Sequence, residues 1–290
     1  MRSRPGKLRR LTALVTSAVL YAALLSPVSP AVAEAPPPAR LCAAQTATLL
    51  AFKARVAAHN AKPHHFLLPR QAAAYSAYNA EAARLRAEQP GIVARLRACI
   101  DAMLVLADGK PNSPAVPTPT KRAEKRIADA LNKLPAGWRP PPPPARGKNW
   151  EVPAPLQPLY LALRSHNPRE MGAAALQGRL PPVPGSRDPA YPPSSGMTIG
   201  GLTPDHINPL AQVIQMPGFT ELTPRNMFLM AHAPINLQWM SYKANLSKSS
   251  RSVLGMSDVS PAWKALQVQL EDRTRRRLQD IIDKLLKSQG

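Results

Sequence analysis

Acidic residues are scarce in this chain of 290 residues: 17 Asp and Glu stand against 38 Lys and Arg, giving a formal net charge of +21. A chain this basic is suited to a polyanionic partner such as nucleic acid, an anionic membrane or a cell-wall polymer. A hydrolase of cell-wall polymers would also need a carboxylate pair or a thiol nucleophile, and the sequence shows no clear pattern for either. Charge alone does not decide among the other partners. A charge that only solubilises the protein, or holds it at a cell surface, is an alternative.

A hydrophobic run long enough to span a membrane comfortably is missing too. The apolar segment from Leu11 to Leu25 is too short for that; it follows five basic residues and precedes the small-residue sequence Ala31-Val32-Ala33. This order is typical of a cleaved secretion signal rather than of an uncleaved anchor. We therefore predict that residues 1–33 are a signal peptide and that the protein is secreted, without stable membrane insertion. Removal of the signal leaves 33 basic and 17 acidic residues.

Cysteine is limited to two residues, Cys42 and Cys99. Both fall on apolar faces of predicted helices, and an even number of cysteines in an exported protein favours a disulfide. Closing a loop of this length stabilises a fold by about 4 kcal/mol in the chain-entropy model. Two buried free thiols are the alternative.

Helical periodicity dominates residues 34–107. Apolar residues recur every three or four positions in three segments, of which Pro69 opens the second and Pro90 the third. This pattern predicts a small helical bundle. Residues 108–148 are predicted to be a Pro-rich linker with one short basic helix, and the five consecutive prolines at 140–144 are expected to adopt polyproline II geometry.

Residues 149–290 are predicted to form the C-terminal domain, with a Pro-rich lead-in and a long basic helix at the end. Ser260 and Pro261 are typical first residues of that helix, which is expected to run to about Lys287. Its inner face is predicted from six apolar residues: Trp263, Leu266, Leu270, Leu278, Ile281 and Leu285. It also carries four arginines that either contact nucleic acid or are simply exposed: Arg273, Arg275, Arg276 and Arg277.

The middle of this domain predicts the order strand, long loop, strand, helix. A strand from Met197 leads to Asp205, a returning strand covers Asn236 to Met240, and a helix covers Tyr242 to Ser252. Pro204 lacks a backbone N–H donor, so the first strand is at best an edge strand. Together with the N-terminal helical bundle, this order predicts an α+β fold that is predominantly helical.

Four polar side chains fall on these elements. A divalent cation that acts on phosphate prefers hard oxygen ligands, which Asp205 and Asn245 can supply. Imidazole titrates near neutrality, so His206 can accept a proton from an attacking water. Asn236 is expected to supply the carbonyl that orients this imidazole. His232, the other candidate base, has no ligand partner at a recognised spacing and is interpreted as structural.

The order and spacing of these four residues resemble the HNH nuclease motif, or ββα-metal finger, in its variant with Asn at the last position. The neighbouring sequences Met216-Pro217-Gly218-Phe219 and Ser247-Lys248-Ser249 strengthen the likeness. The resemblance covers about residues 197–255 and is to the HNH domains of bacterial secreted proteins of the polymorphic-toxin type.

This resemblance implies a C-terminal domain that hydrolyses phosphodiester bonds in nucleic acid, with DNA favoured over RNA. Asp205 and Asn245 are then the ligands of a divalent metal, expected to be Mg²⁺, with His206 as the base and Asn236 as the supporting residue. Two uses of such a site stay open. One is attack on neighbouring cells, with an immunity protein as a partner, and the other is scavenging of extracellular nucleic acid.

The basic residues around Asn245 are predicted to contact nucleic acid. Lys243, Lys248 and Arg251 can neutralise phosphates, in contacts that carry no sequence information; a solvated basic helix face is the alternative. The competing class of function is a non-catalytic secreted basic protein with a degenerate HNH fold, which binds nucleic acid or a cell surface. Asn245 in place of His, and Pro204 ahead of the motif, are the departures that leave room for it.

Overall fold

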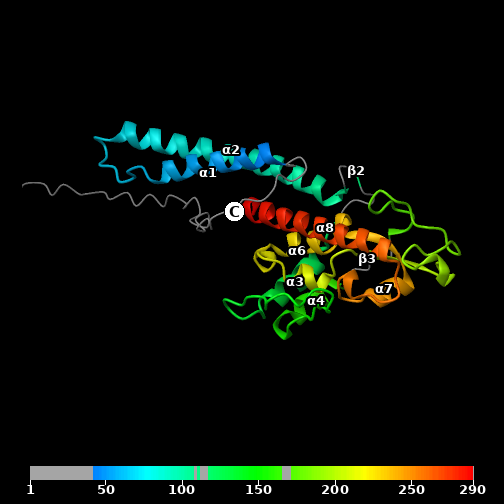
Figure 1. Cartoon of the computed structure of the whole chain (residues 1–290). Coiled ribbons are helices and arrows are strands. Elements are labelled where there is room, and N and C mark those ends of the chain that lie inside the picture. Colours follow the sequence, from blue (N-terminus) through cyan, green and yellow to red (C-terminus); the bar gives the residue numbers. More distant parts are fainter. Residues whose placement is uncertain (1–41, 108–109, 112–116, 165–170, 290) are drawn as a thin grey trace, which may run out of the picture. The chain divides into compact units, whose positions relative to one another are not determined.

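The structure, a computed structural model, describes residues 42–107, 110–111, 117–164 and 171–289. The predicted signal peptide, residues 1–33, lies outside the described residues. The chain divides into two compact units, the first ending at Cys99 and the second running from Ile100 to Gln289. Helices predominate in the described residues, and the strands form two small two-stranded sheets (Figure 1), which agrees with a mainly helical α+β class. No helix in this part of the chain has the length and hydrophobicity to cross a membrane.

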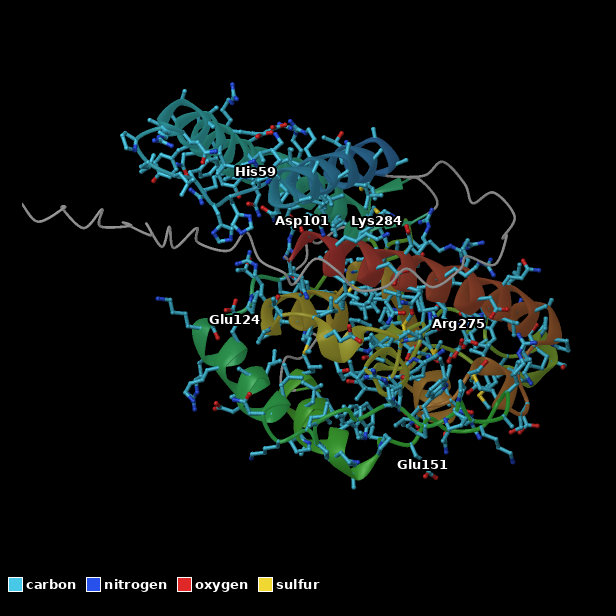
Figure 2. All side chains as sticks on the ribbon, turned by 90° about the vertical axis from the view of Figure 1, so that its left-hand side faces the viewer. His59, Asp101, Glu124, Glu151, Arg275 and Lys284 are labelled. Carbon is cyan, nitrogen blue, oxygen red and sulfur yellow. A yellow bond between two sulfur atoms is a disulfide. The ribbon has the colours of Figure 1, made fainter. Side chains whose placement is uncertain are left out.

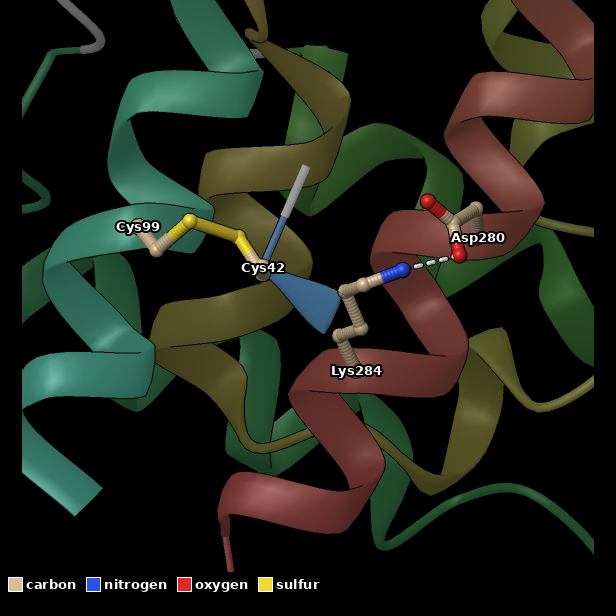
Figure 3. The surroundings of a disulfide bond; sticks show 4 residues. All are labelled: Cys42, Cys99, Asp280 and Lys284. Atoms are coloured by element: carbon tan, nitrogen blue, oxygen red, sulfur yellow. Dashed lines mark hydrogen bonds and ion pairs between the residues drawn. A yellow bond between two sulfur atoms is a disulfide. The ribbon is translucent and has the colours of Figure 1, made fainter. Parts of the chain in front are cut away.

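The first unit is a helical hairpin. α1 (Ala43–Asn60) and α2 (Ala72–Val105) lie side by side, and a disulfide between Cys42 and Cys99 joins the start of α1 to α2 (Figure 3). The predicted disulfide is therefore confirmed. Apolar side chains of both helices are buried: Leu49, Phe52, Val56, Ala82, Leu85, Ile92 and Leu96.

Pro90 lies inside α2 rather than at the start of a third helix, which corrects the prediction of three helical segments. A proline in a helix interior removes one backbone hydrogen bond and costs about 3 kcal/mol. The apolar stripe nevertheless continues in the same helical phase from Leu85 through Ile92 to Leu96, and all three side chains are buried. Burial of this stripe favours one continuous helix over a break at the proline.

The second unit contains the end of α2 and the remaining elements. Its other α-helices are α3 (Lys121–Leu131), α4 (Gln157–Arg164), α5 (Leu210–Val213), α6 (Pro224–Ala231), α7 (Tyr242–Lys248) and α8 (Pro261–Ser288). Its strands are β1 (Leu106–Ala107), β2 (Lys110–Pro111), β3 (Leu202–His206) and β4 (Leu237–Ser241). Short 3-10 helices are η2 (Ala154–Leu156), η4 (Pro193–Ser195), η5 (Phe219–Glu221), η6 (Pro234–Asn236) and η7 (Val253–Gly255). β1 pairs with β2, and β3 with β4, both antiparallel.

Residues 117–148 fall within the second compact unit, and α3 is the short basic helix predicted in this segment. Thr120 caps the helix by accepting a hydrogen bond from the Ala123 N–H at 3.1 Å. The apolar face of α3 includes Ala123, Ile127 and Ala130, all buried, and the helix packs against α4 and α6. Most of the surface of this basic helix faces solvent, and one narrow apolar stripe is enough to pack it against α4 and α6.

β3, β4 and α7 form the predicted strand–loop–strand–helix unit, which we call the finger. In the antiparallel register Asp205 lies opposite Gln238, and His206 is the last residue of β3. β4 passes directly into α7, because Ser241 caps the helix by accepting a hydrogen bond from the Ala244 N–H at 3.2 Å. β3, β4 and α7 are in direct contact with one another.

The boundaries of the finger differ from the prediction at both ends. β3 begins at Leu202 rather than at Met197, and α7 ends at Lys248 rather than at Ser252. α7 stops because Ser249 takes a φ of 54°, outside the helical region. The two-stranded sheet leaves Pro204 on an edge strand, as predicted.

α8 begins at the predicted cap, where Ser260 Oγ accepts a hydrogen bond from the Trp263 N–H at 3.4 Å. Its C-terminal half buries four apolar side chains: Leu278, Ile281, Ile282 and Leu285. Leu266, predicted on the inner face, is 65 % exposed. In its first half α8 contacts η7, and Glu271 is among the side chains that make this contact.

Candidate functional site

Asp205 and Lys248 form a buried ion pair inside the finger. Lys248 Nζ lies 3.0 Å from Asp205 Oδ2 and donates a second hydrogen bond to the His206 carbonyl at 2.5 Å. Asp205 is 5 % exposed and Lys248 is 0 % exposed. Gln238 Nε2, across the sheet on β4, lies 3.5 Å from the same carboxylate oxygen. The pair joins β3 to the last residue of α7, and Oδ1 of Asp205 takes part in none of these bonds.

Lys248 therefore does not lie on the exposed basic face predicted for it. It follows Ala244 by four residues, which places both on the same side of α7, and Ala244 is buried as well. Lys243 is exposed, with its ammonium 5.4 Å from the centre of the Tyr191 ring. Arg251 is half-buried and donates to a backbone carbonyl of α7 at 2.6 Å. Of the three predicted phosphate contacts, Lys243 is the one with an exposed side chain.

The imidazole of His206 is held by a backbone carbonyl. Nε2 lies 2.9 Å from the Ala231 oxygen, so Nε2 carries the hydrogen and Nδ1 keeps its lone pair. Burial, the largest effect, lowers the pKa of His206 below its ordinary value. The Ala231 carbonyl and the Asp205 carboxylate raise this pKa less, and the Lys248 ammonium lowers it. Ala231, the last residue of α6, is thus the orienting acceptor, in place of the Asn236 carbonyl that the sequence predicted.

Asn236 fixes the loop that follows His206. Its Oδ1 accepts a hydrogen bond from the Asn208 N–H at 2.9 Å, and its Nδ2 donates to the Asn208 carbonyl at 2.9 Å. The Ile207 N–H donates to the Asn236 carbonyl at 2.7 Å. Asn236 is 1 % exposed, so these bonds are shielded from water. Asn236 therefore supports His206 through the backbone of the next two residues and not through the imidazole ring.

Asn245 lies in the middle of α7, three residues before Lys248 and hence about one helical turn from the ion pair. Its side chain is half-buried and makes no hydrogen bond with the residues that the structure describes. Its amide oxygen therefore accepts no hydrogen bond from the described residues. An oxygen that is to bind a metal ion has to be available in this way.

Glu271 on α8 belongs to the same buried polar cluster, although no sequence pattern marks it. Its Oε1 accepts a hydrogen bond from the Val253 N–H at 2.8 Å, and its Oε2 from the Ser252 hydroxyl at 2.5 Å. Its backbone carbonyl accepts from Asn208 Nδ2 at 3.2 Å. Burial raises the pKa of the Glu271 carboxyl above its ordinary value, and the two hydrogen bonds to the carboxylate oppose this rise. Glu271 thus joins α8 both to η7 and to the loop after His206.

Asp188 fixes the start of α7 and was not recognised from the sequence. Its Oδ2 accepts a hydrogen bond from the Ser241 hydroxyl at 2.5 Å, and its Oδ1 accepts from the Ala190 N–H at 3.0 Å. Ser241 is the N-cap of α7, so the Pro-rich lead-in orients this helix. The local signal is Asp188-Pro189, a turn-forming pair. Such a pair does not indicate a partner 53 residues away.

His232 is 4 % exposed and lies directly after α6. Its Nδ1 lies 2.8 Å from the Phe228 carbonyl, and its ring centre lies 4.2 Å from that of Phe228. These contacts agree with its interpretation as a structural residue.

No protein-family model, curated protein or solved structure matches this chain.

The donor set of the finger fits a hard divalent cation held mainly by water. Asp205 Oδ1 and the Asn245 amide oxygen take no part in the hydrogen bonds described above. Three or more His, Cys, Asp or Glu side chains do not gather into a metal-binding group anywhere in the described ranges. Two protein oxygens completed by water and phosphate suit Mg²⁺. Lys248 already places a positive charge at the other carboxylate oxygen, which weakens the attraction of Asp205 for a second cation.

Proposed function

We propose that the second unit is a metal-dependent endonuclease that hydrolyses phosphodiester bonds in nucleic acid. The observation that supports this most directly is the state of His206, whose Nε2 is bound to the Ala231 carbonyl while Nδ1 keeps its lone pair. Asp205 precedes it on β3, and Asn245 lies on the helix into which β4 leads. An oriented neutral imidazole, together with carboxylate and amide oxygens on the same strand–helix unit, is suited to metal-assisted hydrolysis of phosphate esters.

In this proposal His206 is the general base. Its Nδ1 takes a proton from the attacking water, and the lowered pKa keeps the ring neutral, and so able to accept it, at pH 7. The Ala231 carbonyl stays bonded to Nε2 and stabilises the imidazolium that forms. Asn236 keeps the loop after His206 in place, so the ring does not have to reorganise during the reaction. A Mg²⁺ ion bound by Asp205 and Asn245 would supply the positive charge that stabilises the phosphate in the transition state.

DNA is the proposed substrate, and the protein is proposed to act outside the cell that makes it. The excess of 38 basic over 17 acidic residues suits a polyanion, and the pattern of residues 1–33 is typical of secretion. The preference for DNA follows the resemblance to HNH domains of secreted toxins. The same resemblance makes an immunity protein the proposed partner, while scavenging of nucleic acid would use the same site.

Degradation of supercoiled plasmid DNA, with Mg²⁺ and with EDTA, tests this function. We expect metal-dependent cutting by the wild type and a loss of about 100-fold or more in His206→Ala, the usual range for removal of a general base. Asp205→Asn, which keeps the shape of the side chain, should also lose metal-dependent cutting. His65→Ala is the matched control, because it removes an exposed histidine from the first unit.

Circular dichroism of each variant verifies that the fold is intact. Cutting by His206→Ala at the wild-type rate would exclude the proposed base. A wild-type protein that cuts neither DNA nor RNA with Mg²⁺ or Mn²⁺ would exclude the enzyme altogether.

A non-catalytic binding protein is the second candidate, and the Lys248–Asp205 pair favours it. The ammonium already compensates the carboxylate that a metal ion would use. The finger would then be a structural unit, and the basic surface would bind a polyanion. DNA binding that weakens steeply with salt, in the absence of any cutting, would identify this function.

A further inference from the structure

Residues 146–150, which we call the strap, lie against the segment that follows α7. The Trp150 N–H donates a hydrogen bond to the Ser250 carbonyl at 3.0 Å. Asn149 forms an antiparallel bridge with Arg251. The end of the Pro-rich stretch is therefore attached by its backbone to residues just beyond the finger.

Two glycines bring the strap and η7 into backbone contact. A Cβ atom added to Gly255 would lie 2.0 Å from the Gly147 oxygen, a distance that no side chain can accommodate without movement of the backbone. Gly147 itself has a φ of 81°, in the region that favours glycine. This contact fixes the backbone of the strap between Arg146 and Lys148, whose side chains are exposed.

Arg146 of the strap and Arg275 of α8 share one carboxylate. The Nη2 atoms of both lie 3.3 Å from oxygens of Asp272, and the two arginine side chains are 72 % and 51 % exposed. One carboxylate compensates one of two guanidinium groups, so a positive charge remains. Lys148, two residues after Arg146, and Arg276, directly after Arg275, are exposed and add two more positive charges. We call Arg146, Lys148, Arg275 and Arg276 the cationic platform; Arg275 is labelled in Figure 2.

The cationic platform is tied to the finger through α8. Glu271, next to Asp272, accepts a hydrogen bond from Asn208 with its backbone carbonyl, and Asn208 lies two residues after His206. The Glu271 carboxylate binds residues 252 and 253, close to the strap contact at Gly255. One turn of α8 thus connects the loop after the proposed base with the strap.

We propose that the cationic platform binds the phosphate backbone of the nucleic acid on which the finger acts, at phosphates other than the reacting one. This inference rests on the proposed function and adds to it a second contact surface. Exposed guanidinium groups form bidentate hydrogen bonds with phosphate oxygens. Such contacts hold the nucleic acid without reading its sequence, so the platform would favour long substrates of any sequence.

Binding of a short fluorescein-labelled DNA duplex, measured by fluorescence anisotropy at several salt concentrations, tests the proposal. The full chain carries His206→Ala in all samples, which prevents cutting. The platform variant replaces Arg146, Lys148, Arg275 and Arg276 with Gln.

A matched control removes four charges elsewhere, by replacing the exposed residues Lys121, Arg122, Lys125 and Lys133 with Gln. Figure 2 shows Glu124, on α3, well separated from Arg275 on α8. Thermal unfolding checks that both variants keep the stability of the parent, as expected for exposed positions.

We expect the platform variant to bind the duplex about 10-fold more weakly or worse, and to lose about 2 or more from the slope of log affinity against log salt, because each phosphate contact contributes about 0.9. The control variant should keep most of its affinity. Equal weakening of the two variants would overturn the proposal, since overall charge would then explain the effect. Loss of binding to phosphatidylglycerol vesicles with unchanged DNA binding would overturn it in favour of a membrane surface. The assay does not depend on cutting, so failure of the platform and failure of the nuclease proposal are separate results.

Discussion

Lys248 Nζ lies 3.0 Å from Asp205 Oδ2, with both side chains shielded from solvent. Buried charges are costly to remove from water, and loss of one partner leaves the other uncompensated. The second bond of Lys248, to the His206 carbonyl, ties the ammonium to the strand that carries the proposed base. The pair therefore holds α7 against β3 and also sets the charge that a metal ion would meet at Asp205.

Lys248→Met should destabilise the second unit by about 3–5 kcal/mol, because the variant keeps the length of the side chain but leaves Asp205 buried without a partner. Lys243→Met is the matched control on the same helix; at this exposed position the free energy of unfolding should change by less than about 0.5 kcal/mol. Urea unfolding followed by tryptophan fluorescence measures both, since all four tryptophans lie in the second unit. Equal stability of the two variants would contradict the buried pair.

Asn236→Ala and Asn245→Ala should separate support from metal binding. Asn236→Ala leaves the Asn208 N–H and carbonyl buried without their partner, at about 1–3 kcal/mol for each group. Asn245→Ala removes a half-buried side chain that makes no hydrogen bond with the described residues, so stability should change by about 0.5 kcal/mol or less, while metal-dependent cutting is lost. Chemical denaturation and the plasmid assay, run on both variants, give the two readouts. A large loss of stability in Asn245→Ala would assign it a structural role instead.

The pH dependence of cutting should report the lowered pKa of His206. The base acts in its neutral form, so the rate should rise with pH and reach half its plateau below pH 6.5, the ordinary value of this group. Initial rates at constant Mg²⁺ across the acidic range measure the midpoint. A midpoint above 6.5 would show either that folding does not lower the pKa of His206 or that His206 is not the base.

Glu271→Gln should change the pH dependence of stability. The raised pKa means that the folded protein holds a proton on Glu271 more tightly than the unfolded chain does, so the stabilisation is complete below the unfolded value of 4.5 and is lost as the pH rises through the folded pKa. Gln does not titrate. The free energy of unfolding of the variant, relative to the wild type, should therefore increase as the pH is raised from 4.5 to neutrality. A difference that is constant over this range would show that burial does not affect the Glu271 carboxyl.

Local sequence was sufficient for the elements of the finger but not for their exact ends. Pro204 marked an edge strand, and a capping Ser followed by Pro261 marked the start of α8, because these effects act within a few residues. Pro90 led to the wrong prediction of a helix break for the same reason. The burial of apolar side chains that keeps α2 continuous depends on contacts outside the turn that contains the proline. The end of α7 depended on the positive φ of Ser249, which no common turn signal indicated.

By itself, the sequence favoured a disulfide between the two cysteines, indicated the mainly helical class and determined the order in which Asp205, His206, Asn236 and Asn245 follow one another. Only the tertiary structure decided that Lys248 is buried against Asp205, that Ala231 orients His206, and that Glu271 connects α8 to the loop beyond it. Periodicity and capping are short-range properties of the chain. The buried ion pair and the hydrogen bonds to backbone carbonyls join residues that are 25 to 63 positions apart in the sequence, and only folding brings these residues together.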